Sequence, residues 1–83
     1  MERAAKGVAN RRRINIMLLL ETRPGLPLQE IAEHLKYNPQ TCDEHVRRLV
    51  TAGLVNKGRH SGIVPHRLTK RGQIVLKFLK NLE

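Results

Sequence analysis

The chain has 83 residues, and its 16 lysines and arginines outnumber its seven aspartates and glutamates, which gives a formal net charge of +9. This length fits one domain with an aliphatic core, and the charge favours a polyanionic partner, nucleic acid before an anionic membrane. The longest purely apolar run, residues 16–20, is far shorter than the roughly 20 residues of a membrane span, and a lone Cys42 cannot close an internal disulfide, so we expect a cytoplasmic protein without a membrane partner.

The first predicted element is a helix that starts near residue 10. Residues 1–9 are small and polar, and we expect a flexible or weakly helical lead-in to a domain of residues 10–83. Apolar residues then stand at 14 and 16–20, which is too continuous for one stripe and indicates a helix buried on two sides. Pro24, Gly25 and Pro27 are expected to end this helix, because proline removes a backbone donor and disfavours helical angles in its predecessor.

Two shorter helices are predicted next, over 28–35 and 39–52. Leu28, Ile31, Ala32 and Leu35 recur at helical spacing and form one apolar stripe. Asn38 is a strong N-cap residue before a proline, and Gly53 follows where a left-handed residue is wanted. The inner face of the second helix is expected to hold Cys42, Val46, Leu49 and Val50. Two helices joined by so short a turn predict a helix-turn-helix.

A β-hairpin and a last helix complete the predicted chain. Residues 54–59 and 63–68 are typical of strands, and the "HSG" between them ends in a glycine that permits positive φ. Pro65 cannot donate to a ladder and should lie at an edge or an irregular point. Thr69 is a plausible N-cap for the helix "KRGQIVLKFLKNL", which is apolar around most of its circumference. The predicted fold class is therefore mainly α with a small β-hairpin: a winged helix-turn-helix with a three-helix core, a β wing and a C-terminal helix.

Two segments resemble a known group of proteins. Residues 28–55, "LQEIAEHLKYNPQTCDEHVRRLVTAGLV", resemble the core of winged helix-turn-helix regulators of the ArsR and MarR families, and "HRLTKRGQIVL" is similar to the segment that closes their wing. The resemblance covers about residues 13–80. It implies sequence-specific binding of double-stranded DNA in transcriptional regulation, with the helix over 38–52 in the major groove and a basic wing over 54–68 on the backbone.

The resemblance also implies which residues contact DNA. Carried over position by position, the base-reading residues are Gln40, Thr41, Asp43, Glu44 and His45, with Arg47 and Arg48 nearer the backbone, and the wing contributes Lys57, Arg59, His60 and Arg67.

Asp43 and Glu44 depart from the family pattern, because carboxylates beside phosphates repel unless they are paired or face a donor such as cytosine N4. An equally good interpretation is that they favour the positive end of their helix and that Glu44 pairs with Arg47 or Arg48.

The basic residues and the apolar surplus give two further expectations. We expect Arg11, Arg12, Arg13, Arg47, Arg48, Lys57 and Arg59 to converge on one side of the fold; if about six of them bind phosphates, log affinity falls with log salt at a slope of about −5. We expect a homodimer, because one small core has little room for the apolar residues of the first and last helices. Its interface set is Ile16, Leu19, Leu20, Val75, Leu76, Phe78, Leu79 and Leu82.

The sequence gives little support for catalysis, for a metal or for a cofactor. No Gly-rich phosphate loop or nucleophile with an evident base is present, and the four histidines have no metal-ligand spacing. We therefore expect no enzyme activity, no metal and no cofactor. Two alternatives to DNA binding stay open: a winged-helix module that binds a protein in a transcription assembly, and binding of structured RNA.

Overall fold

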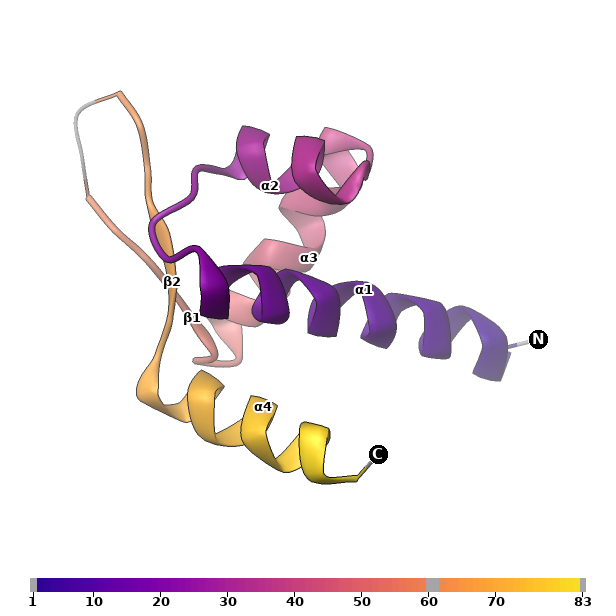
Figure 1. The fold of residues 1–83 in the computed structure, drawn as a ribbon. Helices are drawn as coiled ribbons and strands as arrows, with labels where there is room; N and C mark the ends of the chain where they lie inside the picture. Colours follow the sequence, from indigo (N-terminus) through magenta and orange to yellow (C-terminus); the bar gives the residue numbers. More distant parts are fainter. Residues whose placement is uncertain (1, 60–61, 83) are drawn as a thin grey trace.

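The computed structural model of the chain describes residues 2–59 and 62–82, with side chains from residue 10 onward. Within these residues the elements are α1 (Glu2–Thr22), α2 (Leu28–Leu35), α3 (Pro39–Thr51), β1 (Val55–Lys57), β2 (His66–Leu68) and α4 (Lys70–Asn81). In Figure 1, α1 runs through the middle of the molecule, with α2 above it, α4 below it and α3 behind. The hairpin rises beside the C-terminal end of α1. The predicted order of helices and hairpin is confirmed.

The N-terminal helix is longer than expected. Because α1 begins at Glu2, the backbone of residues 2–9 is part of this helix. Whether this first part of the helix is flexible in solution stays a prediction. The other end of α1 is as expected, since the helix ends at Thr22, two residues before Pro24, and Gly25 has a φ of 95°.

Both ends of α3 follow from local chemistry. The side-chain oxygen of Asn38 accepts hydrogen bonds from the backbone N–H groups of Gln40, at 2.9 Å, and Thr41, at 3.3 Å. Pro39 occupies the first helical position, where its missing N–H has no cost. Gly53, just beyond the helix, has a φ of 76°, the left-handed conformation that closes many helices. The predicted caps therefore fix the limits of α3.

The start of α4 is tied to the end of α3. Thr69 Oγ1 accepts the N–H of Gly72 at 2.9 Å and donates to the carbonyl of Gly53 at 2.6 Å. The N–H of Thr69 donates to the carbonyl of Leu54 at 3.0 Å. Gly72 is buried here, and a Cβ at this position would collide with the Leu54 carbonyl. The first turn of α4 thus lies so close to the backbone of residue 54 that only glycine fits at position 72.

The hairpin is antiparallel and shorter than the sequence predicts. Its register pairs Val55 with Leu68, Asn56 with Arg67 and Lys57 with His66. One more bond follows, in which the N–H of Gly58 donates to the carbonyl of Pro65 at 2.8 Å. The ladder does not continue through Pro65 because proline has no N–H to return. The predicted strands at 54–59 and 63–68 are therefore too long at the loop side.

A contact that we did not predict fixes the hairpin to the connection between α1 and α2. Leu26 forms an antiparallel bridge with His66: the N–H of His66 donates to the Leu26 carbonyl at 3.0 Å, and Gly25 donates to the His66 carbonyl at 2.9 Å. The ring Nδ1 of buried His66 also lies 3.0 Å from the Leu26 carbonyl. Through this bridge, His66 of β2 pairs with β1 on one side and with Leu26 on the other.

One core lies where α1 contacts α2, α3, β2 and α4. This explains why α1 is apolar on more than one side, and it corrects part of the expected dimer interface. Ile16, Leu19, Leu20 and Leu76 are buried within the single chain, so they are not available to a second copy. The other buried apolar residues are Met17, Ile31, Ala32, Cys42, Val46, Leu49 and Val55.

The remaining residues of that expected interface lie on α4 or, for Leu82, at its C-cap. Val75 and Leu79 are half-buried against the core, whereas Phe78 is 63% exposed and Leu82 is 67% exposed. Ile74, one turn before Phe78, is 62% exposed. An apolar strip on α4 therefore remains uncovered by the single chain.

Candidate nucleic-acid interface

The outward face of α3 is polar and accessible. Gln40, Glu44, Arg47 and Arg48 are exposed, and Thr41 and Asp43 are half-buried at its margins. The opposite face contributes Cys42, Val46 and Leu49 to the core, as predicted. A capped helix with one face in the core and the other in solvent can enter a groove that is about as wide as itself.

Both carboxylates on this face are paired within the helix. Arg47 lies 3.2 Å from Asp43, and Arg48 lies 3.4 Å from Glu44, each at a spacing of four residues. These four side chains sum to zero charge. Since exposed pairs of this kind contribute only about 0.3–0.5 kcal/mol, each arginine can be released at little cost. The expected pairing of Glu44 is present, and attraction of a polyanion has to come largely from other elements.

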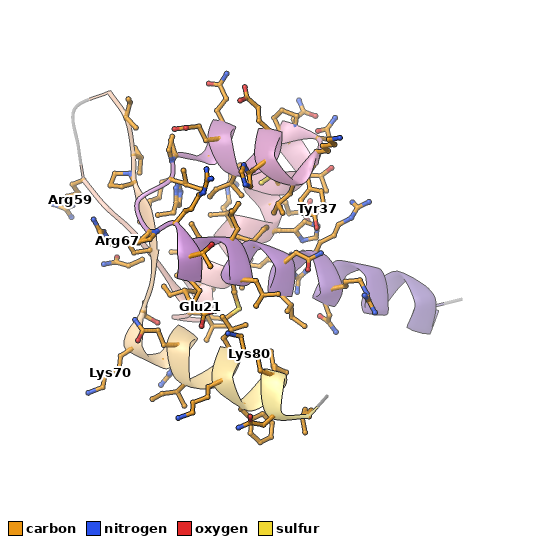
Figure 2. All side chains as sticks on the ribbon, viewed as in Figure 1. Glu21, Tyr37, Arg59, Arg67, Lys70 and Lys80 are labelled. Carbon is orange, nitrogen blue, oxygen red and sulfur yellow. The ribbon has the colours of Figure 1, made fainter. Side chains whose placement is uncertain are left out.

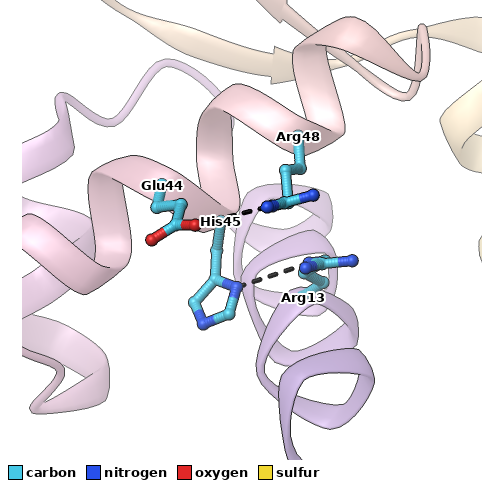
Figure 3. Close-up of polar contacts among 4 residues, drawn as sticks. All are labelled: Arg13, Glu44, His45 and Arg48. Atoms are coloured by element: carbon cyan, nitrogen blue, oxygen red, sulfur yellow. Dashed lines mark hydrogen bonds and ion pairs between the residues drawn. The ribbon is translucent and has the colours of Figure 1, made fainter. Parts of the chain in front are cut away.

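His45 does not belong to the outward face, which corrects its expected role in base reading. It is only 8% exposed, and its Nδ1 accepts a hydrogen bond from Arg13 Nε of α1 at 3.3 Å (Figure 3). Burial, and then the guanidinium groups of Arg13 and Arg12, lower the pKa of His45 below its ordinary value of 6.5. The imidazole is therefore neutral at pH 7 and links the two helices.

Two of the cations expected on the wing are accessible to solvent. Lys57 and Arg59 are exposed; His60 lies outside the described residues. Lys57 lines a groove of about 570 Å³ between the hairpin and the helix-turn-helix, together with Asp43, Glu30 and Ile63. The wing therefore flanks α3 on the side of Asp43.

Arg67 lies on a different face from Lys57. Neighbouring strand residues point to opposite faces of a hairpin, and Arg67 lines a cavity of about 610 Å³ with Glu21, Lys77 and Lys80. Figure 2 shows Arg67 at the outer side of the hairpin, with Glu21 and Lys80 facing each other between α1 and α4. Lys80 Nζ donates to Glu21 at 2.6 Å. The expected wing set is thus divided between two faces.

Cys42 and the histidines offer no reactive or metal centre in the part of the chain that the structure describes. Burial, and then the charge of Asp43, raise the pKa of the Cys42 thiol to about 11, so it is protonated and unreactive at neutral pH. Among the described residues, no group of three or more His, Cys, Asp or Glu could hold a metal ion. Of the helices in residues 2–59 and 62–82, none has the length and apolarity that a membrane span requires.

The fold and the accessible helix followed by a basic hairpin define a class: a winged helix-turn-helix protein. The family model described as "Winged helix-turn-helix DNA-binding" matches residues 10–56, so the chain belongs to this family. Its solved structural neighbours include transcription regulators of the MarR family, in agreement with the resemblance found in the sequence. None of the curated protein sequences is significantly similar to the chain.

Three solved structures illustrate the likeness. The PcaV transcriptional regulator from Streptomyces coelicolor, in complex with its natural ligand, is 28% identical, with a TM-score of 0.74 over 78% of this chain and 48% of that one. The MarR family transcription regulator SP03579 is 19% identical, with a TM-score of 0.79 over 84% and 48%. FabT from Streptococcus pneumoniae, in complex with DNA, is 17% identical, with a TM-score of 0.71 over 87% and 52%. This chain spans about half the length of each of them.

Proposed function

We propose that the protein is a transcriptional regulator that binds specific sequences of double-stranded DNA as a homodimer. In this proposal α3 enters the major groove, where Gln40 and Thr41 contact base edges, and Lys57 and Arg59 of the wing contact the phosphate backbone. Membership of a DNA-binding winged helix family supports it, as does the DNA in the complex of the structurally similar FabT.

The outward face of α3 is the observation that carries the proposal. An α-helix with its side chains is about 10–12 Å wide, and the major groove of B-DNA is about 12 Å wide. The exposed side chains of this face are an amide, a carboxylate and two guanidinium groups, which can all hydrogen-bond to bases or phosphates. Within this face Glu44 can accept from cytosine N4 once Arg48 turns to a phosphate.

The dimer is proposed on the uncovered strip of α4. Ile74, Phe78 and Leu82 are spaced by four residues, so they follow one line along the helix, and each is more than 60% exposed. A two-fold axis through this strip would present two α3 helices to half-sites about 34 Å apart on one face of DNA. The proposed interface therefore keeps Phe78 and Leu82 of the expected set and adds Ile74.

A salt titration tests the binding. Fluorescence anisotropy with a labelled duplex should show affinity that falls steeply with salt, whereas absence of binding at low salt would remove DNA as the partner. Arg59→Ala should make the slope of log affinity against log salt shallower by about one. It should also weaken binding to all sequences alike, because a phosphate contact carries no sequence information. Gln40→Ala and Thr41→Ala should change which sequences are selected from random duplexes.

Light scattering tests the dimer. Phe78→Glu places a charge in the proposed seam and should yield monomers, while Lys77→Glu, on the exposed neighbour, should leave the dimer intact. A wild-type protein that stays monomeric at high concentration would contradict this part of the proposal.

A further inference from the structure

Two neighbouring arginines of α1 are held against the helix-turn-helix by uncharged partners. The guanidinium carbon of Arg12 lies 5.3 Å from the centre of the Tyr37 ring, and Arg13 Nε donates to His45 Nδ1 at 3.3 Å. The Tyr37 hydroxyl in turn accepts a hydrogen bond from Asn15 Nδ2 at 3.1 Å, which fixes the ring. Each arginine is therefore oriented by an aromatic residue that carries no negative charge.

The charges of these two arginines are not neutralised in the described part of the chain. The ion pairs there join Arg47 to Asp43, Arg48 to Glu44 and Lys80 to Glu21, and none includes Arg12 or Arg13. His45 stays neutral at pH 7 because burial and the neighbouring guanidinium groups oppose its protonation. Both arginines are half-buried, so part of each residue stays accessible to solvent.

The position of Arg12 and Arg13 relative to α3 follows from the helix geometry. Successive residues of a helix are about 100° apart, which places Asp43 at one margin of the outward face and Arg48 and His45 toward the other. Asp43 shares its groove with Lys57 of the wing, while His45 contacts α1. In Figure 3 the guanidinium groups of Arg13 and Arg48 project to the same side. The wing and the two arginines of α1 therefore flank the outward face on opposite sides.

We infer that Arg12 and Arg13 form a second phosphate-binding point, on the side of α3 opposite the wing, and that Tyr37 and His45 are positioning residues for them. The inference rests on the proposed binding of duplex DNA. A guanidinium has five N–H donors, and Arg13 uses one of them for His45, so the others can serve a phosphate. The outward face of α3 is neutral as a whole, so cations on both of its flanks would supply the attraction and fix the depth of the helix in the groove.

Neutralising substitutions test the phosphate contacts. Arg12→Gln and Arg13→Gln should each make the slope of log affinity against log salt shallower by about one. At 0.1 M salt this corresponds to about eightfold weaker binding, without a change in sequence preference. Lys77→Gln is the matched control, because it removes one exposed cation from α4, beside Glu21 at the other end of α1. It should leave the affinity within about twofold of the wild type.

The positioning role needs a measurement that loss of folding would not reproduce. His45→Leu removes the acceptor and should weaken DNA binding in the wild-type background but have no further effect in Arg13→Gln. His45→Asn, whose amide oxygen can accept from Arg13, should restore part of the lost affinity. Far-UV circular dichroism and urea unfolding identify the folded variants, and His45→Phe, which keeps a ring but offers no acceptor, replaces His45→Leu in the cycle if His45→Leu does not fold.

The outcomes separate this inference from the proposed function. If Arg59→Ala loses one unit of salt slope while Arg12→Gln and Arg13→Gln bind like the wild type, the second phosphate-binding point is wrong and DNA binding stands. If His45→Leu weakens DNA binding as much in Arg13→Gln as in the wild type, the positioning role of His45 is wrong. If the wild type does not bind duplex DNA at low salt, the proposed function fails, and the inference fails with it.

Discussion

For the substitution Gly72→Ala, the structure predicts a loss of stability and helix propensity predicts a gain. In an exposed helix the change from glycine to alanine stabilises by about 1 kcal/mol. Here the new Cβ would lie against the carbonyl oxygen, carbonyl carbon and Cα of Leu54, which are backbone atoms that cannot turn aside. The first turn of α4 would have to move away from residue 54.

The size of the effect follows from what that movement breaks. It strains the cap in which Thr69 Oγ1 accepts the N–H of residue 72, worth about 1 kcal/mol, and the bond from Thr69 N to Leu54 O, worth about 1 kcal/mol. Overpacking adds about 1–3 kcal/mol, and the alanine propensity offsets about 1 kcal/mol. We therefore expect a net loss of at least about 2 kcal/mol, or a Tm lower by about 8–16 °C.

Urea and thermal unfolding followed by far-UV circular dichroism measure this loss at one fixed protein concentration, which matters for a chain proposed to dimerise. Gln73→Ala is the control: it changes the exposed neighbour in the same turn and should stay within about 0.5 kcal/mol of the wild type. A Gly72→Ala protein as stable as the wild type, or more stable, would refute the close approach of α4 to residue 54.

Three further predictions concern the core and its titratable groups. Because the folded pKa of His45 is below 6.5, the unfolded chain binds more protons than the folded one. The free energy of unfolding should therefore decrease as pH falls from about 6.5 through the lowered value. Urea titrations at pH 7 and 5 measure this decrease, which should be smaller in His45→Asn. Leu76→Ala, at a fully buried position, should lower the free energy of unfolding by about 2–5 kcal/mol, whereas Phe78→Ala should lower it far less in a dilute monomeric sample. Equal decreases for the two variants in urea unfolding would contradict the assignment of Leu76 to the core. The buried Cys42 thiol, with a pKa of about 11, should resist iodoacetamide at pH 8 until urea unfolds the chain, as mass spectrometry of the alkylated protein would show.

Local chemistry explains which parts of the fold were predictable. Asn38 and Thr69 cap their helices, and Gly53 takes a left-handed conformation, because each depends on hydrogen bonds or dihedral angles within a few residues. The helical stripes likewise identified most of the buried residues of α2 and α3. Such signals are present in the sequence itself, and so the order of elements followed from it.

The errors arose where distant segments decide the outcome. From its continuous apolar pattern, α1 is expected to share its apolar residues between the core and a second copy, although the helix contacts α2, α3, β2 and α4 of the same chain. The resemblance places His45 among the base-reading residues, although helical spacing puts it beside the inner residues Cys42, Val46 and Leu49, and its partner Arg13 is 32 residues away. The division of Lys57 and Arg67 between two faces depended on the register of the hairpin, which its turn signal alone did not fix.

The bridge between Leu26 and His66 has a consequence for how the molecule opens. Its two residues are 40 positions apart, and the whole helix-turn-helix lies in the loop that they close. The hairpin therefore cannot detach at this point without releasing both ends of that loop. Amide hydrogen exchange at Gly25 and His66 should be as slow as global unfolding, so that wing and helices open as one cooperative unit.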